Sequence, residues 1–299
     1  MLDLGIVILN YNTKGMTLDC LRSLYKHPPS CKFEVWLVDN ASEDGSVDAV
    51  RKHFPRVRLI ANDTNSGFAC GNNLALRKIY KNCRYCLLLN TDTIILPGAF
   101  DRLVDFADRT GYGITTCRLL FPDHSFQANV GSLPSLGPAL SWLTGIDDIF
   151  RKITPIPSYH QESKLFYKGE REVGWISGSV MLIAQKVMRK IGFLDERIFM
   201  YGEDVDYCLR AHKAAFKLGW TDKAEIIHIG GASSDKPKLR QWTGEFKGLL
   251  YVYKKHYGRL PQFGMRLLSY IFILARIVAF LLLGRSEHAR TYAKVIISI

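Results

Sequence analysis

Acidic and amide side chains follow four successive apolar runs in the first third of the chain. These polar loops are residues 10–12, 39–46, 62–73 and 90–92. Each loop taken alone could be an ordinary turn, because Asn, Asp, Gly and Ser favour turns for backbone reasons. Four such loops in succession are harder to explain in that way. Side chains of this kind can ligate a divalent cation, bind a polar ligand or accept a proton.

The elements that must position these loops alternate along the chain. Apolar runs predict strands at 4–9, 33–38, 57–60 and 85–89, and amphipathic stretches predict helices at 16–26, 46–53, 68–80 and 99–109. Such alternation is typical of an α/β protein with a parallel sheet and helices on both faces. Ligands bind beyond the carboxyl ends of the strands in these sheets, so the polar loops should carry the chemistry. The chain lacks both a G-x-G-x-x-G after the first strand and a P-loop motif, which disfavours dinucleotide and P-loop sites.

The composition is that of a globular protein, and its charge is concentrated at one end. The 299 residues are 47% hydrophobic, which excludes disordered and collagen-like classes. The net charge is +12, but residues 1–235 hold 28 basic and 26 acidic side chains, whereas residues 236–299 hold 12 and 2. A basic total alone would suggest nucleic acid or an anionic membrane as the partner. Because most of the excess positive charge lies in the last fifth of the chain, it is a property of that segment and not of the whole protein.

Seven cysteines, an odd number, are scattered along the chain, which favours reduced thiols in the cytosol. Cys83 and Cys86 form a single C-x-x-C, for which metal binding or redox use is the alternative to two half-buried thiols that lead into a strand. The apolar N-terminus lacks the basic region and cleavage site of a signal peptide and predicts a buried strand.

Six motifs, in order, resemble those of family 2 glycosyltransferases, which have the nucleotide-sugar-binding GT-A fold. The resemblance covers roughly residues 3–232, and within the family it points to the bacterial rhamnosyltransferase-like branch that acts in cell-surface polysaccharide assembly. The motifs are Asn10-Tyr11-Asn12, Val38-Asp39-Asn40-Ala41-Ser42, Asn65-x-Gly67-Phe68-Ala69-x-Gly71-Asn72-Asn73, Leu89-Asn90-Thr91-Asp92, Trp175-Ile176-Ser177-Gly178-Ser179 and Phe199-Met200-Tyr201-Gly202-Glu203-Asp204-Val205-Asp206. The resemblance implies a mostly parallel central sheet with flanking helices, and transfer of a hexose from a nucleotide diphosphate.

The resemblance also implies a Mg²⁺ or Mn²⁺ ion that neutralises the leaving diphosphate. Asp92 is the candidate ligand, because it stands at the last position of the family's D-x-D motif or its Asn-x-Asp variant. Asn90 occupies the first position, so one carboxylate is missing. His228 matches a downstream histidine that can complete the metal shell in relatives, and a structural histidine in an apolar strand is the alternative.

Asp204 resembles the general base of the family, which takes the proton of the acceptor hydroxyl. An acidic base without a covalent nucleophile implies a single displacement with inversion at the anomeric carbon. Carboxylates nearby could raise the pKa of Asp204 toward a useful value. Glu203 is assigned to the sugar and acceptor pocket, although Glu203 and Asp206 also suit the start of a helix predicted at 205–214.

The remaining motif residues are assigned by resemblance to the donor and the pocket. Asp39 resembles the residue that reads the nucleobase and suits a pyrimidine with a free ring N–H, so UDP- or dTDP-sugars are expected donors, with dTDP-rhamnose favoured by the branch. The other expected donor contacts are Asn10, Asn12, Asn40, Gly67, Gly71, Asn72, Asn90 and Asp92. Trp175, Ser177 and Gly178 are expected to form the floor of the sugar and acceptor pocket. The alternatives are that Trp175 is a core tryptophan and that the glycines of the motifs only permit turns.

Residues 236–299 are expected to form a helical extension that follows a catalytic domain of residues 1–235. The run 267–283 carries a single charge, Arg276. A membrane span needs ~20 predominantly apolar residues and a central Arg costs ~2.5–3.5 kcal/mol, so spanning is marginal. An interfacial helix whose arginines snorkel to lipid headgroups fits better. A helix packed on the catalytic domain or on a homodimer partner is the alternative.

The basic extension favours an anionic membrane surface as partner, because each Lys or Arg near it adds about 1 kcal/mol. We therefore expect a peripheral or monotopic protein at the cytoplasmic face of the bacterial inner membrane, with a lipid-linked saccharide acceptor. Residues 119–170 match no motif strongly and are expected to supply acceptor contacts and a lid. A nucleic-acid-binding protein and an inactive membrane-docked scaffold are the competing hypotheses. The sequence contains no nucleic-acid-binding motif, which argues against the first hypothesis. The presence of Asp39, Asp92 and Asp204 argues against the second.

Overall fold

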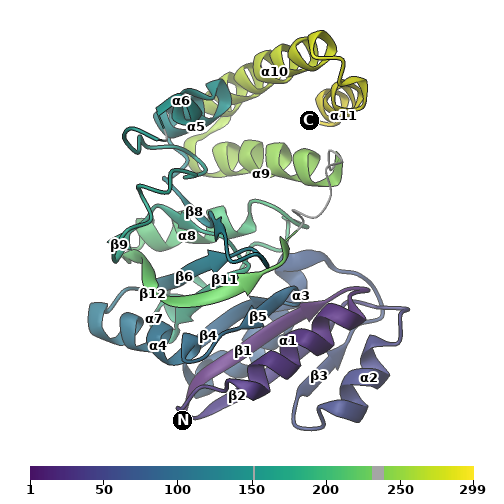
Figure 1. Cartoon of the computed structure of the whole chain (residues 1–299), viewed down its shortest axis with the longest axis vertical. Helices are drawn as coiled ribbons and strands as arrows, with labels where there is room; N and C mark the ends of the chain where they lie inside the picture. Colours follow the sequence, from purple (N-terminus) through teal and green to yellow (C-terminus); the bar gives the residue numbers. More distant parts are fainter. Residues whose placement is uncertain (151, 231–238) are drawn as a thin grey trace.

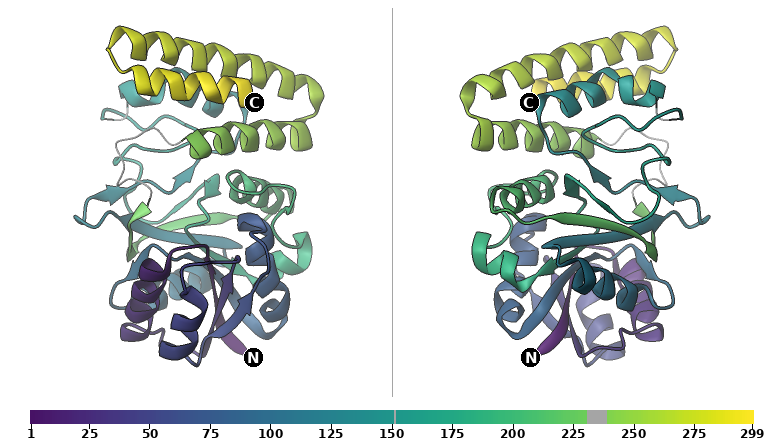
Figure 2. Two further views of the ribbon diagram at one scale, coloured as in Figure 1. Left: turned by 90° about the vertical axis from the view of Figure 1, so that its right-hand side faces the viewer. Right: turned by 90° about the vertical axis from the view of Figure 1, so that its left-hand side faces the viewer.

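The computed structural model describes residues 1–150, 152–230 and 239–299. A sheet flanked by helices occupies the end of the molecule that holds the N-terminus, and the C-terminal helices form a layer at the opposite end (Figures 1 and 2). The helices α5 and α6, from the middle of the chain, lie beside this C-terminal layer (Figure 1). The protein therefore has a sheet end and a helical end.

The first half of the chain forms the elements that the alternation predicts. The strands are β1 (Leu2–Asn10), β2 (Phe33–Asp39), β3 (Arg58–Ala61) and β4 (Cys83–Asn90), and the helices are α1 (Lys14–Lys26), α2 (Ser46–His53), α3 (Gly67–Ile79) and α4 (Ala99–Thr110), with a 3-10 turn η1 (Tyr80–Asn82). The four strands are parallel in the order β3-β2-β1-β4. Asn10 pairs with Asp39, and Leu9 with Asn90, so three of the polar loops begin side by side.

The chain after β4 adds strands of both directions to the same sheet. The added strands are β5 (Thr93–Ile95), β6 (Ile114–Leu120), β7 (Phe126–Gln127), β9 (Arg171–Glu172), β11 (Val180–Ala184) and β12 (Leu218–His228). The main order is β3-β2-β1-β4-β11-β6-β12-β5, in which β6 and β12 are parallel whereas β11 and β5 run antiparallel to their neighbours. The predicted parallel sheet thus describes its first half, and the whole sheet is mixed.

The remaining segments cover the sheet or stand above it. β8 (Val130–Gly131) and β10 (Trp175–Ile176) form a separate antiparallel pair. The helices of this part are α5 (Leu136–Thr144), α6 (Ile146–Phe150), α7 (Gln185–Ile191) and α8 (Glu203–Lys213). Cys83 and Cys86 are buried with their Sγ atoms 3.3 Å apart. Among the described residues no group of three or more His, Cys, Asp or Glu side chains could hold a metal ion, so the C-x-x-C has no further ligands.

Three helices form the C-terminal layer: α9 (Leu239–Tyr257), α10 (Arg259–Leu282) and α11 (Ser286–Ser298). α10 packs on α5, α9 and α11. In the described part of the chain it is the one helix long and apolar enough to cross a membrane by length and composition. Its outer face carries exposed apolar side chains at helical spacing, namely Leu260, Phe263, Leu267, Ile271, Leu274, Val278 and Leu281. We call these seven residues the apolar stripe.

The side chain of Arg276 points inward, unlike the snorkelling arginine that the sequence predicts. Its guanidinium carbon lies 4.4 Å from the ring centroid of Phe272 and 5.8 Å from those of Trp242 and Tyr292. Its Nη1 also donates a hydrogen bond to the Tyr292 hydroxyl at 3.2 Å. Because aromatic faces attract a cation, Arg276 turns inward among rings from all three C-terminal helices. The apolar stripe is consequently free of charge.

Candidate active site

A cavity of about 600 Å³ lies beyond the carboxyl ends of β1 and β4. Its walls come from the loops that follow the four strands β1 to β4, from the segments 119–170 and 175–179, from the start of α8, from the end of β12 and from α9. Ten of the residues expected to form the site line it: Asn40, Gly67, Asn90, Asp92, Trp175, Ser177, Gly178, Glu203, Asp204 and His228. The fold thus gathers motifs that lie far apart in the sequence into one space.

Asp92 and His228 lie together, as the metal prediction requires. The His228 Nε2 atom is 3.3 Å from Asp92 Oδ1, and the other oxygen, Oδ2, accepts a hydrogen bond from the Gly230 amide. Burial opposes ionisation of Asp92, but His228 and the Gly230 amide outweigh it and lower the pKa of the carboxyl. His228 Nδ1 is 2.8 Å from Gln127 Oε1. Gln127 Oε1 can accept a hydrogen bond from the Nδ1–H of His228, which leaves Nε2 facing Asp92, where a neutral imidazole would offer its lone pair to a cation bound between them.

These two side chains fit a Mg²⁺ or Mn²⁺ ion that keeps waters and substrate phosphates in its shell. A carboxylate and an imidazole leave most coordination positions to other ligands, in keeping with the missing first acid at Asn90. Gln127 is absent from the sequence prediction. It belongs to a two-residue strand in the segment without motifs, where no local pattern marks it.

Glu203 and Asp204 open α8 beside each other, and their environments differ. Asp204 Oδ1 accepts a hydrogen bond from the Val205 amide and Oδ2 accepts one from the Gly178 amide at 3.1 Å. Burial, with the nearby charge of Glu245, nevertheless raises the pKa of Asp204 to about 6. Burial and the Asp204 charge hold the pKa of Glu203 well above its usual range. Glu203 is therefore the acid of the pair that holds its proton more firmly, and Asp204 is the group able to accept a proton near neutral pH.

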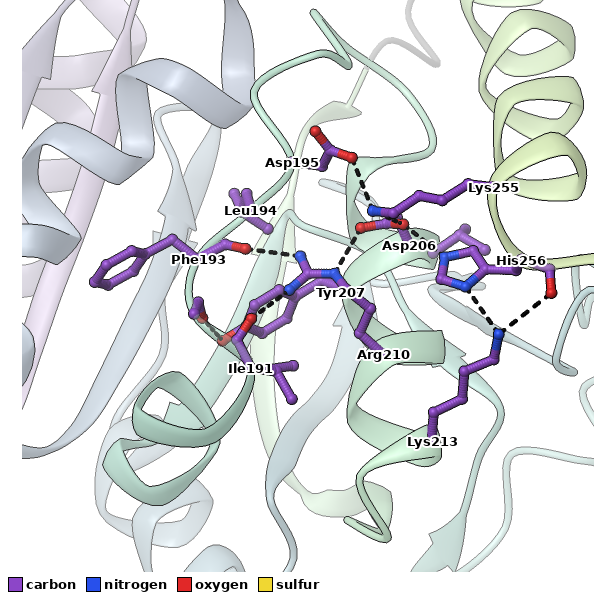
Figure 3. A network of polar contacts seen from close by, with 12 residues as sticks. Ile191, Phe193, Leu194, Asp195, Asp206, Tyr207, Arg210, Lys213, Lys255 and His256 are labelled. Atoms are coloured by element: carbon purple, nitrogen blue, oxygen red, sulfur yellow. Dashed lines mark hydrogen bonds and ion pairs between the residues drawn. The ribbon is translucent and has the colours of Figure 1, made fainter.

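Asp206, two residues further on, belongs to a different network. It is fully buried, and its carboxylate contacts Arg210, Lys255 and His256 at 2.8, 2.6 and 2.7 Å (Figure 3). Burial opposes its ionisation, but these partners lower its pKa to about 2. Lys255 also binds Asp195 at 2.8 Å. Asp206 therefore joins α8 to α9 instead of lining the cavity.

Five residues expected to bind the donor do not line the cavity: Asn10, Asn12, Asp39, Gly71 and Asn72. Asp39 is 1% exposed, and its oxygens accept hydrogen bonds from the Asn10 side chain at 2.6 Å and the Ser42 amide at 2.8 Å. The Asn12 amide in turn donates to the Ser42 hydroxyl at 2.8 Å. In this structure these residues hold the loops after β1 and β2 together, at the edge of the site.

The glycines are explained by close packing. Gly67 has a φ of +83°, and a Cβ there would collide with the Phe199 carbonyl. A Cβ on Gly71 would meet Leu9 and the amide of Asn40. Asn72 is buried and donates to the Phe68 carbonyl at 2.9 Å. Close packing therefore accounts for glycine at both positions, and Gly67 also needs its positive φ, whereas Gly71 lies inside α3.

Trp175 has features of both interpretations, a core tryptophan and a residue of the pocket. Its indole N–H donates to the Tyr159 carbonyl at 2.6 Å, and the side chain is buried, yet it lines the cavity. Ser177 and Ser179 bond through their hydroxyls at 2.6 Å beside it. The lining residues that the site prediction does not name include His160, Gln241 and Glu245. The one available signal was the Gly244 and Gly248 pair, whose spacing marks a helix face that packs closely.

Comparison with known proteins agrees with this geometry. Residues 5–170 match the family model described as glycosyl transferase family 2. The chain belongs to this family. It is 27% identical over 235 residues to the N-acetylglucosaminyl-diphospho-decaprenol L-rhamnosyltransferase of Mycobacterium tuberculosis, which covers 75% of this chain and 76% of that protein. It is 28% identical over 171 residues to the rhamnosyltransferase WbbL of Escherichia coli, covering 54% and 60%. The predicted likeness to the rhamnosyltransferase branch of family 2 is confirmed.

Solved structures confirm the GT-A fold of this family 2 glycosyltransferase. The mannosyltransferase PcManGT from Pyrobaculum calidifontis, in complex with GDP-Man and Mn²⁺, matches with a TM-score of 0.58 at 14% identity, over 99% of this chain and 76% of that one. Residues 1–349 of TarS from S. aureus match with a TM-score of 0.53 at 14% identity, over 99% and 90%. These likenesses extend beyond the family match at residue 170 and include α8 and β12.

Proposed function

We propose that this glycosyltransferase moves a hexose, rhamnose first among the candidates, from a dTDP- or UDP-sugar to a hydroxyl of a lipid-linked saccharide. The observation that carries the proposal is the presence of Asp204 in the same cavity as the Asp92 and His228 pair. Asp204 can take a proton from the acceptor, and Asp92 and His228 can hold a cation against a diphosphate. Relatives whose names state rhamnosyl transfer to a decaprenol-linked sugar support this choice of donor and acceptor.

Each residue has a distinct task in this reaction. A Mg²⁺ or Mn²⁺ ion, when bound, would neutralise the charge that develops on the leaving diphosphate. Asp92 and His228 would hold it, with Gln127 fixing the imidazole. Asp204 accepts the proton as the acceptor oxygen attacks the anomeric carbon, and no second carboxylate is needed as a nucleophile, so the product is inverted. Asp39, Asn10 and Asn12 shape the loops at which we place the nucleobase.

A donor screen tests the proposal. The protein is incubated with UDP-, dTDP- and GDP-sugars, Mg²⁺ or Mn²⁺, and a lipid-linked acceptor, and release of nucleotide diphosphate is followed. We expect release with a pyrimidine donor, and we expect the metal to be required. No release with any donor, with or without acceptor, would contradict the function.

The transfer rate is expected to rise with pH through about 6 and then level off. Asp204 must be deprotonated to act, and its raised pKa of about 6 places that step in the accessible range. The measurement is kcat/KM against pH with the metal saturating at each point, since protons also compete with metal binding. A profile that is flat between about pH 5 and pH 7 would contradict a base with this pKa.

We also propose that residues 236–299 hold the enzyme on an anionic membrane, at the cytoplasmic face of the bacterial inner membrane. The apolar stripe of α10 supports docking along the surface, since its charge-free face points outward and Arg276 points inward. Basic residues of the extension add attraction to anionic headgroups. Of these, Lys236 and Lys238 lie outside the described residues.

Leu274→Glu is expected to reduce binding to anionic vesicles about tenfold or more, because burying one Leu contributes ~1.5–3 kcal/mol. Sedimentation with phosphatidylglycerol-containing vesicles measures the effect. Lys52→Glu, on exposed α2 at the sheet end, changes the charge more but should leave binding nearly unchanged. Equal losses in the two variants would point to net charge instead of the apolar stripe.

A further inference from the structure

The first turns of α9 form one wall of the catalytic cavity. Gln241 and Glu245 are one helical turn apart, and both line the space that holds Asp204. The Glu245 side chain is 17% exposed, so it is largely withdrawn from bulk solvent. The C-terminal extension thus contributes side chains to the site as well as an apolar surface.

α9 packs directly on the loop that leads to the base. A Cβ on Gly248 would collide with the Tyr201 carbonyl and Gly202, and one on Gly244 would collide with the Tyr201 ring. Glycine at both positions lets the helix touch the two residues that precede Glu203. Further along α9, the Asp206 network described above fixes the helix to α8 (Figure 3). Glu245 is therefore held in a fixed relation to Asp204.

His160 holds the Glu245 side chain from the other side. Its Nε2 atom lies 2.8 Å from Glu245 Oε1. The ring stands edge-on to Trp175 and Tyr159, with centroids 5.1 and 4.7 Å apart. Burial opposes protonation of His160, but the Glu245 charge outweighs it and raises its pKa. The pair is therefore held together by this contact and set against an aromatic wall.

The chemistry of this wall suits a neutral polyhydroxyl ligand. In the described part of the chain no Lys or Arg lines the cavity, and its acids include Glu162, Glu203, Asp204 and Glu245. A carboxylate accepts hydrogen bonds from hydroxyl groups, and Trp175 adds an aromatic side chain to the lining. A saccharide ring presents hydroxyls at its edge and C–H groups on its face. An anionic group would meet repulsion at the same place.

We propose that Glu245, positioned by His160, binds hydroxyl groups of the acceptor saccharide and so determines which acceptor hydroxyl reaches Asp204. This inference rests on the proposed glycosyl transfer and adds a role to the C-terminal extension. It makes α9 part of the acceptor site, while the loops that follow β2, β3 and β4 remain on the donor side.

Glu245→Gln tests the inference, because it keeps the size of the side chain and removes its charge. With the full-length protein, we expect the acceptor KM to rise at least tenfold. The donor KM should stay unchanged, and the slow hydrolysis of donor by water, measured without acceptor at a pH well above 6 where Asp204 is ionised in both proteins, should change far less than the acceptor KM. Binding of the methyl β-glycoside of N-acetylglucosamine, followed by saturation-transfer NMR with nucleotide diphosphate present, should weaken in parallel. Glu287→Gln, the same change on the exposed surface of α11, is the matched control and should leave all four quantities unchanged.

An unchanged acceptor KM and unchanged glycoside binding in Glu245→Gln would overturn the inference. So would a proportional loss of donor hydrolysis and transfer, which would mean that Glu245 serves the donor or the fold. Weaker glycoside binding in a protein that transfers no sugar from any donor would uphold the saccharide site and contradict the proposed reaction. These outcomes distinguish a failure of the acceptor-site inference from a failure of the proposed reaction.

Discussion

Asp204→Asn is expected to lower the rate of sugar transfer by about 10²–10⁴-fold, the usual contribution of a positioned general base, while donor binding persists. The amide has nearly the shape of the carboxylate, and its oxygen can still accept the hydrogen bond from Gly178 or Val205. It cannot take the proton of the attacking hydroxyl. Comparing kcat for transfer with the donor dissociation constant from calorimetry separates these effects.

Glu203→Gln provides the internal comparison for this variant. Burial and the Asp204 charge raise the pKa of Glu203 well above its usual range, so replacing this acid with an amide should change the charge of the site little, and we expect activity within a few-fold of the original. Asp19→Asn, on the exposed surface of α1, controls for the substitution itself. Full transfer activity in Asp204→Asn would remove this residue as the base. A loss in Glu203→Gln as large as in Asp204→Asn would move the proton transfer to Glu203.

Most of the first half of the molecule could be predicted, because its order is local. β1 and β4 are covered on both faces and therefore appear as continuous apolar runs. The helix expected at 46–53 matches α2. Loops placed after such strands must meet at one edge of the sheet, so the neighbourhood of Asn10, Asp39 and Asn90 followed from topology alone.

The second half depends on contacts that no short segment encodes. β11 enters between β4 and β6 although it lies about ninety residues after β4 in the chain, and it runs antiparallel to both. The side chains that support or complete the site share this property. Gln127 and His160 belong to the segment without motifs, and Glu245 belongs to the basic extension. Their partners lie 101 and 85 residues away along the chain, so spacing could not reveal them.

The composition of the basic extension does not reveal where its charged side chain Arg276 lies in the structure. Its charge predicts a membrane partner, and the single Arg276 within the apolar run looks like a residue that reaches for lipid headgroups. The structure places Arg276 among aromatic rings because Trp242, Phe272 and Tyr292 come from three different helices that pack together. Only the assembled layer shows which face of α10 stays exposed.

Asp92→Asn is expected to reduce transfer at a fixed, low Mn²⁺ concentration by about 10²-fold or more and to raise the Mn²⁺ concentration that gives half-maximal activity. The cation site rests on one carboxylate and one imidazole, because Asn90 replaces the first acid of the motif. An amide oxygen binds a divalent cation more weakly than a carboxylate does. It can still accept the hydrogen bond from Gly230, so the loop should keep its shape. Mn²⁺ binding is measured by electron paramagnetic resonance alongside the rate.

Gln127→Leu should reproduce this defect in milder form, and the comparison decides whether His228 is a metal ligand. Without the Gln127 oxygen, the Nδ1 proton of His228 loses its acceptor and the orientation of Nε2 is no longer fixed. Loss of such a supporting contact typically costs about 10–100-fold in metal affinity or activity. Excess Mn²⁺ should then restore most of the rate in Gln127→Leu, since the ligands themselves remain. If Gln127→Leu leaves the Mn²⁺ dependence unchanged while Asp92→Asn shifts it, His228 is a structural partner of Asp92 and the cation depends on Asp92 and the substrate phosphates.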